Sequence, residues 1–270
     1  MRDNAGATRP ANRRHAEIMT ILQEAGRASV EDLAARLLVT PQTIRRDLNE
    51  LAELRKVTRV HGGAMVASSV ANLAYEARKL VAQPVKQLIG EAAARLIPDN
   101  SSLIINIGTT TEEVARALGG HAGLLVITNN LHVASELYKH PGIELILAGG
   151  SVRRSDGGII GAATVEHIRQ FRADLAVIGT SAIDPDGTMF DFDSREVQVS
   201  RAIIESARRV MLVADSSKFT RSAPVRIAHL RDVDVIVTDR LAAPETAELC
   251  DRLGVHVVQA GGADDLEPPD

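Results

Sequence analysis

The sequence predicts an α/β protein in two parts: a small, mostly helical N-terminal part, and a larger open α/β part whose strands alternate with helices. Three observations carry this prediction. Short amphipathic helix patterns follow one another before residue 52, small and polar residues occupy 66–82, and beyond them short apolar runs alternate with amphipathic ones. With 270 residues, of which 45% are hydrophobic and 24% charged, the chain has the length for two domains and the composition of a globular protein.

The three helix patterns of the N-terminal part each have recognisable ends. The first ends at Gly26, and the second begins with Ser29 and Asp32 in capping-box spacing. The third follows after a short, tight connection, with Thr40 as N-cap and Pro41 at the first helical position, where a missing N–H costs nothing. The apolar positions are Ile18, Ile21, Leu22 and Ala25 in the first pattern, Val30, Leu33, Ala34 and Leu37 in the second, and Ile44, Leu48 and Leu51 in the third.

The third helix pattern leaves a polar, basic face opposite its apolar one. Arginine forks match guanine edges or phosphates, glutamine and asparagine can pair with adenine, and a helix N-terminus favours a phosphate. A tight turn before such a helix, and an alternating segment at 56–63 that ends in a glycine pair, make the layout of a winged helix-turn-helix DNA-binding domain. The alternative is a small helical subdomain whose arginines are only solvated. The expected DNA contacts are Thr40, Gln42, Thr43, Arg45, Arg46 and Asn49 on the helix, and Arg55, Lys56, Arg59 and His61 on the wing.

Charge is divided unevenly along the chain. Residues 1–66 hold 11 Lys and Arg against 8 Asp and Glu, whereas the remainder holds 20 against 27, so only the N-terminal part is expected to meet a polyanion. No secretory signal and no apolar run of membrane-spanning length is visible, which predicts a cytoplasmic protein without membrane contact. A single cysteine, Cys250, and eight histidines without metal-ligand spacing predict neither disulfide, metal nor cofactor.

Residues 40–51 (TPQTIRRDLNEL), followed by 59–64 (RVHGGA), closely resemble the DNA-binding signature of DeoR-type bacterial repressors. The resemblance implies a transcriptional repressor that binds double-stranded operator DNA. A dimer or tetramer is expected, because symmetric half-sites need a symmetric protein. Asp47 and Glu50 within the signature would repel phosphates, so we interpret them as residues that orient the arginines.

The larger part is expected to hold a mostly parallel sheet covered on both faces, because fully apolar strands alternate with helices. On this interpretation the winged domain spans 1–65, a linker 66–82, the open α/β domain 83–260 and a disordered acidic tail 261–270. The expected strands are 103–107, 124–128, 143–148, 174–179, 209–214, 234–238 and 254–258. The expected helices are 86–96, 110–118, 130–138, 162–170, 195–206 and 243–253.

A candidate phosphate site lies where residues 104–113 run from a buried strand through a Gly-Thr turn into a helix. Backbone N–H groups and hydroxyls there converge at the positive end of the helix dipole. The alternative is an ordinary cap, since Thr109 and Glu112 stand in capping-box spacing. Polar residues also end other strands, at 128–130, 149–150 and 215–218, and in open α/β sheets these ends form the ligand crevice. One of the five lysines, Lys218, would supply the positive charge that a phosphate prefers.

These segments also resemble the sensor domain of DeoR-type repressors, whose fold is related to ribose-5-phosphate isomerase and CoA transferase; the resemblance covers about residues 13–240. It implies a phosphorylated effector, glycerol 3-phosphate or a sugar phosphate, with Glu196 as a further pocket wall and Arg78 at the junction of linker and sensor. Asn106 stands where the most similar members carry Asp, which removes a charge beside the pocket. The expected effector contacts are Asn106, Gly108, Thr109, Thr110, Thr111, Thr128, Asn129, Asn130, Gly149, Gly150, Glu196 and Lys218.

An enzyme remains the alternative to a ligand-controlled repressor, because the resemblance extends to isomerases. Isomerisation of a phosphosugar needs a carboxylate base and an electrophile. The turn at 179–184, which would correspond to the carboxylate-bearing turn of those enzymes, lacks the first carboxylate. We therefore predict no catalytic residues. The turn Asp156-Gly157-Gly158 is either a second pocket loop or only a turn.

Overall fold

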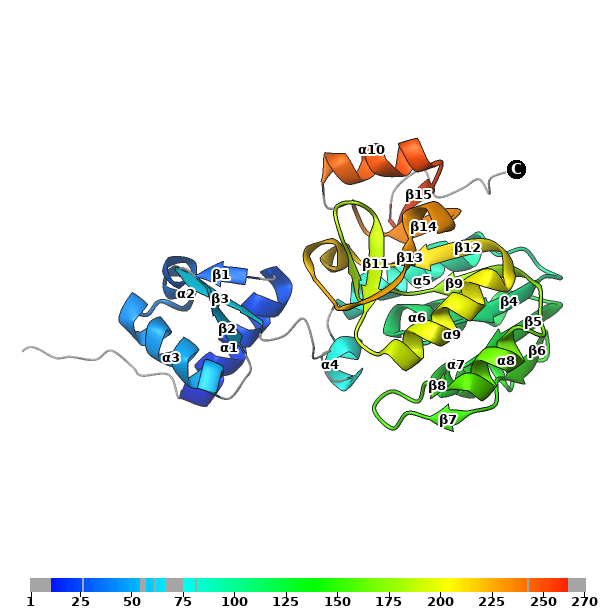
Figure 1. Cartoon of the computed structure of the whole chain (residues 1–270), viewed down its shortest axis with the longest axis horizontal. Coiled ribbons are helices and arrows are strands. Elements are labelled where there is room, and N and C mark those ends of the chain that lie inside the picture. The colour runs from blue at the N-terminus through cyan, green and yellow to red at the C-terminus, as the bar shows by residue number, and fades with distance from the viewer. Residues whose placement is uncertain are drawn as a thin grey trace, which may run out of the picture. The chain divides into compact units, whose positions relative to one another are not determined.

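The computed structural model describes residues 11–25, 27–53, 57–60, 62–66, 75–80, 82–241 and 243–261. They form two compact units, divided between Asn72 and Leu73 (Figure 1). The structure confirms the α/β class, with a helical N-terminal unit and an open α/β C-terminal unit. Within the described ranges, no helix combines the length and apolar character that crossing a bilayer requires.

The N-terminal unit packs three helices against a small antiparallel sheet, whose strand order is β1-β3-β2. Its elements are α1 (Ala11–Ala25), β1 (Arg27–Ser29), α2 (Val30–Leu37), α3 (Pro41–Glu53), β2 (Val57–Val60) and β3 (Gly63–Val66). Ser29 caps α2 as predicted, because its hydroxyl accepts the backbone N–H of Asp32 at 3.0 Å. The pairing of β1 with β3 was not predicted. It explains one of the two wing glycines, since a Cβ on Gly63 would lie 2.2 Å from the carbonyl oxygen of Ala28.

The core of this unit consists largely of the apolar positions that helical spacing identified. Ile18 and Leu22 of α1 are fully buried, as are Ile44, Leu48 and Leu51 of α3. The four predicted positions of α2, Val30, Leu33, Ala34 and Leu37, are buried as well. The face of α3 that carries its polar residues is therefore turned away from the core.

The C-terminal unit is built on a seven-stranded sheet in which every pairing is parallel. The strand order is β15-β14-β12-β9-β4-β5-β6. All seven expected strands are present, at β4 (Ser102–Ile105), β5 (Leu124–Thr128), β6 (Ile143–Leu147), β9 (Ala173–Ile178), β12 (Ala207–Val213), β14 (Val235–Thr238) and β15 (His256–Gln259).

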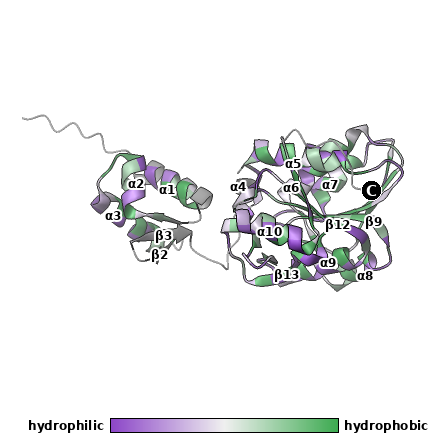
Figure 2. Cartoon of the chain, turned by 90° about the horizontal axis from the view of Figure 1, so that it is seen from above, coloured by the Kyte–Doolittle hydropathy of each residue, from purple (hydrophilic) through white to green (hydrophobic). Residues whose placement is uncertain are grey.

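Helices cover both faces of this sheet, as Figure 2 shows for the layers around β9 and β12. Successive residues along a strand alternate between two hydrophobic cores, one on each face of the sheet. In β9, Leu175 and Val177 belong to the first core, whereas Ala176 and Ile178 belong to the second. The helices α5 (Gln83–Arg95), α6 (Thr109–Ala117) and α7 (Leu131–Leu137) contribute to the first core. The helices α8 (Ala162–Ile168), α9 (Ser194–Glu205) and α10 (Pro244–Leu253) contribute to the second.

Several short elements were not predicted. The helix α4 (Tyr75–Leu80) lies within 66–82, the stretch expected to be a linker. A hairpin pairs β7 (Ser151–Val152) with β8 (Ile159–Ile160), and a second small sheet has the order β10-β11-β13. Its strands are β10 (Ala182–Ile183), β11 (Thr188–Asp191) and β13 (Val225–His229). The 3-10 helices are η1 (Leu118–Gly120), η2 (Ser216–Thr220) and η3 (Leu230–Asp232). The expected acidic tail, beyond Gly261, lies outside the described residues.

Candidate functional site

Helix α3 presents its polar residues on the surface of the N-terminal unit. Gln42, Arg45, Arg46 and Asn49 are exposed, and Thr43 is half-buried. The side chain of Arg46 is 83% exposed, so its fork can reach a duplex. The helix begins as predicted, because the Thr40 hydroxyl accepts the N–H of Thr43 at 3.2 Å.

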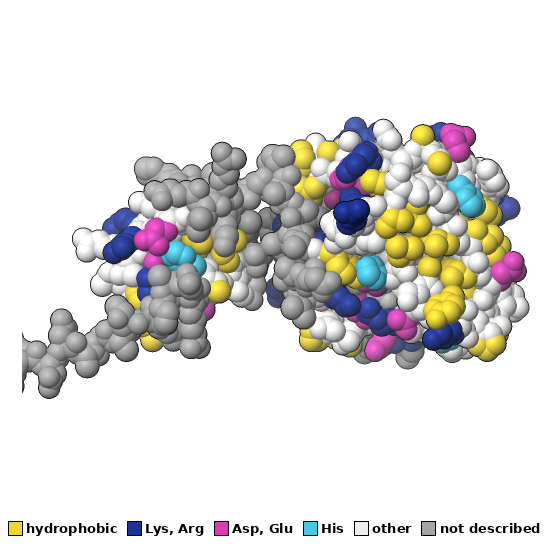
Figure 3. All heavy atoms as spheres, turned by 90° about the horizontal axis from the view of Figure 1, so that it is seen from below, with side chains coloured by type: hydrophobic (Ala, Val, Ile, Leu, Met, Phe, Trp, Pro, Cys, Tyr) yellow, Lys and Arg dark blue, Asp and Glu magenta, His cyan; other side chains and the backbone are white. Residues whose placement is uncertain are grey.

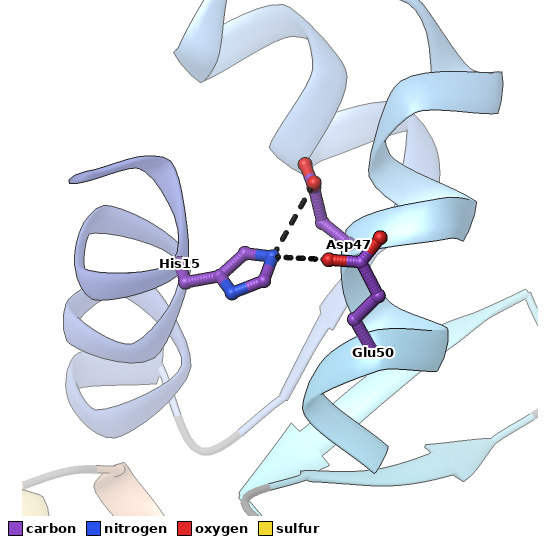
Figure 4. Close-up of side chains that lie close together, drawn as sticks. All are labelled: His15, Asp47 and Glu50. Atoms are coloured by element: carbon purple, nitrogen blue, oxygen red, sulfur yellow. Dashed lines mark ion pairs between the residues drawn. The ribbon is translucent and has the colours of Figure 1, made fainter. Parts of the chain in front are cut away.

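Asp47 and Glu50 of α3 are both paired with basic residues. Asp47 is 2% exposed and accepts a hydrogen bond from Arg14 Nη2 at 2.7 Å. His15 Nε2 lies 3.4 Å from Asp47 Oδ1 and 3.5 Å from Glu50 Oε2 (Figure 4). Glu50 also accepts from Nε of Arg46 at 3.1 Å. Since the Arg14 guanidinium bonds both Asp47 oxygens, the cluster is an ion-pair network rather than a cation site, and it can orient Arg46.

The wing is only partly described. Arg59 lies in β2, with its side chain outside the described residues, and Arg55, Lys56 and His61 lie outside them altogether. The expected contacts at these positions stay predictions.

A pocket lies in the C-terminal unit, at the carboxyl ends of β4, β9 and β12. It brings together six of the expected effector contacts, namely Gly108, Thr109, Thr110, Thr111, Glu196 and Lys218. The other lining residues are Arg78, Ile107, Gly179, Thr180, Ser181, Asp191 and Val213. The position agrees with the rule that parallel sheets bind ligands where their strands end.

The start of α6 forms one wall of the pocket. Gly108 is its N-cap residue, with φ 153°, and a Cβ there would lie 3.2 Å from Thr111 Oγ1. No side chain of the described residues caps this helix, so the capping box considered above does not form. The Glu112 carboxylate instead accepts from the Tyr75 hydroxyl at 2.8 Å and from Asn130 Nδ2 at 3.2 Å. The first N–H groups of α6 are therefore available to an anion.

Lys218 lines the pocket with this helix start, and the charges of Lys86 and Arg221 act on it. Burial lowers the pKa of Lys218 to about 8, although the charge of Asp215 opposes the shift. Burial likewise lowers the pKa of Lys86 to about 8 and that of the Arg221 guanidinium. Asp215 Oδ2 lies 4.0 Å from Lys218 Nζ, and despite burial the lysine keeps the pKa of that carboxyl below its usual value. Cations that are costly to bury are stabilised by a bound phosphate.

Two carboxyl groups, those of Asp191 and Glu196, also line the pocket, and burial raises the pKa of both. Burial, together with the charge of Asp191, raises the pKa of Glu196 to about 8 even though Arg153 Nη2 lies 2.6 Å from its Oε2. Burial also raises the pKa of Asp191. A protonated carboxyl does not repel an anion and can donate a hydrogen bond to a hydroxyl or phosphate oxygen. The pocket can therefore accept an anionic ligand near neutral pH.

Asn106 is not among the pocket-lining residues. Its Nδ2 donates to the Ser200 hydroxyl at 2.9 Å, and its Oδ1 accepts the N–H of Ile107 at 2.8 Å. Both ends of the amide are thus occupied within the protein, and the side chain stabilises the turn that leads into the pocket. An Asp at this position would bury a charge against Ser200 rather than place one in the pocket.

The expected contacts at the ends of β5 and β6 also line no part of this pocket. The Thr128 hydroxyl donates to the carbonyl of Ile105 at 2.7 Å, and Asn130 Oδ1 caps α7 by accepting the N–H of His132 at 2.8 Å. Asn129 Nδ2 donates to a carbonyl of β8. Gly149 and Gly150 lead into the β7 hairpin instead. Gly150 needs its φ of 151° and its missing Cβ, which would lie 2.1 Å from Thr164 Oγ1.

Arg78 and Asp191 are pocket residues that sequence patterns did not assign. Asp191 ends the short strand β11, and Arg78 lies on α4, so neither belongs to an element with a readable period. The Asp156 turn proves to be the tip of the β7–β8 hairpin: Asp156 Oδ2 lies 2.6 Å from Arg153 Nη2 and 3.3 Å from Arg78 Nη2. The turn therefore contacts Arg78, which lines the pocket, and Arg153, which pairs with the pocket residue Glu196.

Two family descriptions match the chain. Residues 14–70 match the DeoR-like helix-turn-helix domain, and residues 82–240 match the DeoR C terminal sensor domain. Together these matches agree with both resemblances given by the sequence motifs.

Curated relatives cover most of the chain. The glycerol-3-phosphate regulon repressor of Haemophilus influenzae is 52% identical over 225 residues, which are 83% of this chain and 88% of that protein. The protein of the same name from Escherichia coli is 46% identical over 246 residues, 91% of this chain and 96% of that one. The HTH-type transcriptional repressor CsqR of Escherichia coli is 42% identical over 230 residues, 85% and 88% of the two chains.

The similarity to solved structures is low in both sequence identity and TM-score. Ribose 5 phosphate isomerase A from Neisseria gonorrhoeae is 16% identical, with a TM-score of 0.37 over 51% of this chain and 53% of that one. The eIF2B beta subunit from Chaetomium thermophilum is 15% identical, with a TM-score of 0.45 over 68% and 56%.

Proposed function

The chain belongs to the DeoR family of transcriptional repressors, and on that premise we propose that a phosphorylated metabolite releases it from its operator. The genes under its control would serve carbohydrate or polyol catabolism. Its relatives' names make glycerol 3-phosphate the first effector to test, ahead of the sugar phosphates.

On the DNA side, α3 would enter the major groove with its exposed face. Gln42, Arg45, Arg46 and Asn49 would read base edges or phosphates, and Thr43 would approach the backbone near the helix start. The basic wing residues Arg55, Lys56, Arg59 and His61, and the start of α3 at Thr40, would add phosphate contacts that fix register.

On the effector side, the make-up of the pocket carries the proposal: Lys218 lines it together with the first turn of α6, which no side chain of the described residues caps. We place the phosphoryl group at the N–H groups of Thr109, Thr110 and Thr111, next to Lys218. The hydroxyl end of the metabolite would meet Glu196 and Asp191. Glu196, whose pKa is raised to about 8, can donate a hydrogen bond there when it is protonated.

Release from the operator requires two states of the protein that the effector distinguishes. The effector must bind more tightly to the state in which the DNA-binding domains no longer match their half-sites, typically by about 1–3 kcal/mol. An effector with equal affinity for both states would leave the operator occupied.

A homo-oligomer would provide the symmetry that paired half-sites require. Hydrophobic side chains gather on one face of the C-terminal unit (Figure 3). The exposed large hydrophobic side chains among the described residues include Leu147, on the edge strand β6, and Val152 of β7. Patches of this kind mark interaction surfaces, and a second copy of the chain is the partner that the function calls for.

The pocket would bind its metabolite without transforming it, in keeping with the names of the relatives. One observation favours the alternative, a phosphosugar isomerase: a pKa near 8 at Glu196 would suit a general base beside Lys218. Long incubation of concentrated protein with aldose and ketose phosphates decides between them. Turnover that Glu196→Gln abolishes would establish the enzyme.

The test of the proposed function is thermal stabilisation of the full chain by a panel of metabolites. Glycerol 3-phosphate would be compared with fructose, glucose, ribose and deoxyribose phosphates, and with inorganic phosphate and sulfate as controls. A ligand at 100 times its Kd adds about 2.7 kcal/mol, which visibly raises the melting temperature. A selective response to one organic phosphate supports the proposal, whereas no response to any of them contradicts the phosphate pocket.

A further inference from the structure

Arg78 connects the first helix of the C-terminal unit with the pocket. It lies on α4, which begins at Tyr75, just after the division of the two units between Asn72 and Leu73. Its side chain is 17% exposed and lines the pocket together with Thr111 and Lys218. An arginine that enters a pocket from the segment next to the DNA-binding unit is in a position to respond to the occupant.

The guanidinium of Arg78 has a hydrogen-bonding group that the protein does not satisfy. One terminal nitrogen, Nη2, donates to Asp156 Oδ2 at 3.3 Å. The Nε–H is buried, yet it has no hydrogen-bond partner among the residues that the structure describes. Buried donors are almost always paired in native proteins, and this one carries part of a permanent positive charge. Its missing acceptor would be an oxygen that arrives with a ligand.

Helix α4 is also held by residues outside the pocket lining, namely Lys86 of α5 and Glu112 of α6. The Lys86 ammonium donates to the carbonyl oxygen of Arg78. The Tyr75 hydroxyl donates to Glu112 Oε2 at 2.8 Å, and its ring stacks on His132 with centroids 4.8 Å apart and planes at 7°. Glu112 belongs to the first turn of α6, where the phosphoryl group is placed. A change at that turn therefore reaches α4 through the hydrogen bond between Glu112 and Tyr75 as well as through Arg78.

We propose that Arg78 is an effector ligand, donating its Nε–H to a phosphate or hydroxyl oxygen, and that α4 carries the signal of pocket occupancy toward the linker. This inference rests on the proposed function. The effector would complete the hydrogen bonds of Arg78 and so favour the arrangement in which α4 is held against the pocket. Effector binding and the position of α4 are then thermodynamically coupled. The factor by which the effector favours this arrangement of α4 equals the factor by which the arrangement increases effector affinity.

The test uses the full chain with Arg78→Lys, which keeps the positive charge but removes the Nε–H from its place. Lys79→Gln is the matched control, because Lys79 is the next residue of the same helix and does not line the pocket. Isothermal titration with glycerol 3-phosphate gives affinity, and fluorescence anisotropy of a labelled operator duplex gives release. We expect Arg78→Lys to bind glycerol 3-phosphate at least about tenfold more weakly, and to release less operator than wild type even when saturated. Lys79→Gln should match wild type in both measurements.

Each outcome has a distinct meaning. Wild-type affinity in Arg78→Lys overturns the ligand role, and full release at saturation overturns the signalling role of α4. Ligand-free melting temperatures establish that the variant is folded, and Arg78→Gln repeats the test without the charge. If the wild-type chain itself fails to bind glycerol 3-phosphate or to leave the operator, the proposed function with this effector fails, whatever Arg78 does.

Discussion

Asp47, on the helix that carries the expected DNA contacts, is buried against Arg14 of α1, whose Nη2 lies 2.7 Å from Asp47 Oδ1. An acidic residue in a DNA-binding signature is thus part of the scaffold. It ties α3 to α1 and keeps its negative charge away from the surface that a duplex would meet. The neighbouring pair of Glu50 and Arg46 is more exposed, and its hydrogen bond can orient the Arg46 guanidinium.

Asp47→Ala should therefore destabilise the N-terminal unit by about 3 kcal/mol, because it removes the carboxylate that accepts two hydrogen bonds from the buried Arg14 guanidinium. Hydrogen exchange of the amides of α1 and α3 measures this locally. Glu31→Ala is the control, since the ion pair of Glu31 with Arg45, at 3.6 Å, is solvent-exposed and should contribute no more than about 1 kcal/mol. Equal exchange rates in the two variants would show that the buried pair does not hold α3.

Arg46→Ala should weaken operator binding by about 1–3 kcal/mol, roughly 5- to 150-fold, if its fork contacts a base. Effector binding should not change. Arg252→Ala removes the same charge from α10 of the other unit and should leave operator affinity at the wild-type level. Anisotropy titrations at one salt concentration compare the three proteins. An unaltered operator Kd in Arg46→Ala would remove this residue from the recognition surface.

Thr110→Asp should abolish effector binding, because a carboxylate at the first turn of α6 would repel the phosphoryl group. Thr110→Asn has nearly the same shape without the charge and should retain most of the affinity. Melting temperatures of the ligand-free proteins check that both fold. If the Asp variant binds glycerol 3-phosphate as well as the Asn variant does, the helix start is not the phosphate site.

Effector affinity should fall as the pH rises above about 8. In the ligand-free protein Lys218, with its pKa lowered to about 8, loses its charge there, whereas a bound phosphate would keep the lysine protonated. Phosphate monoesters, with a second pKa near 6, do not change charge in this range. Titrations at pH 7.5 and 9.5 should show about a tenfold loss for wild type and a smaller loss for Lys218→Arg, which stays charged. Equal wild-type affinities at the two pH values would show that Lys218 does not lose a charge needed for effector binding in this range.

The fold could be predicted best from the sequence where buried residues form a pattern over several positions. Strands covered on both faces are continuous apolar runs, so Leu124–Thr128 and the other six strands could be located within a few residues. Helical spacing identified Ile44, Leu48 and Leu51 as core, and with them the outward face of α3.

The pocket was harder to predict, because its residues meet only in the folded chain. Gly108–Thr111 and Lys218 could be inferred from local chemistry, since each follows a strand. Arg78 and Asp191 come from elements too short to show a period, and nothing in their neighbours indicates the pocket. Asn106 is a polar residue at a strand end whose side chain donates to Ser200 and does not line the pocket, which its place in the sequence does not reveal.

The most direct test of the account is operator binding by the full chain with and without phosphorylated metabolites. A duplex selected by the protein from a random library would be labelled and titrated at physiological salt. The account predicts sequence-specific binding whose Kd rises about 5- to 150-fold with saturating glycerol 3-phosphate, or with the one sugar phosphate that stabilises the protein. Specific binding that no phosphorylated metabolite weakens would contradict it.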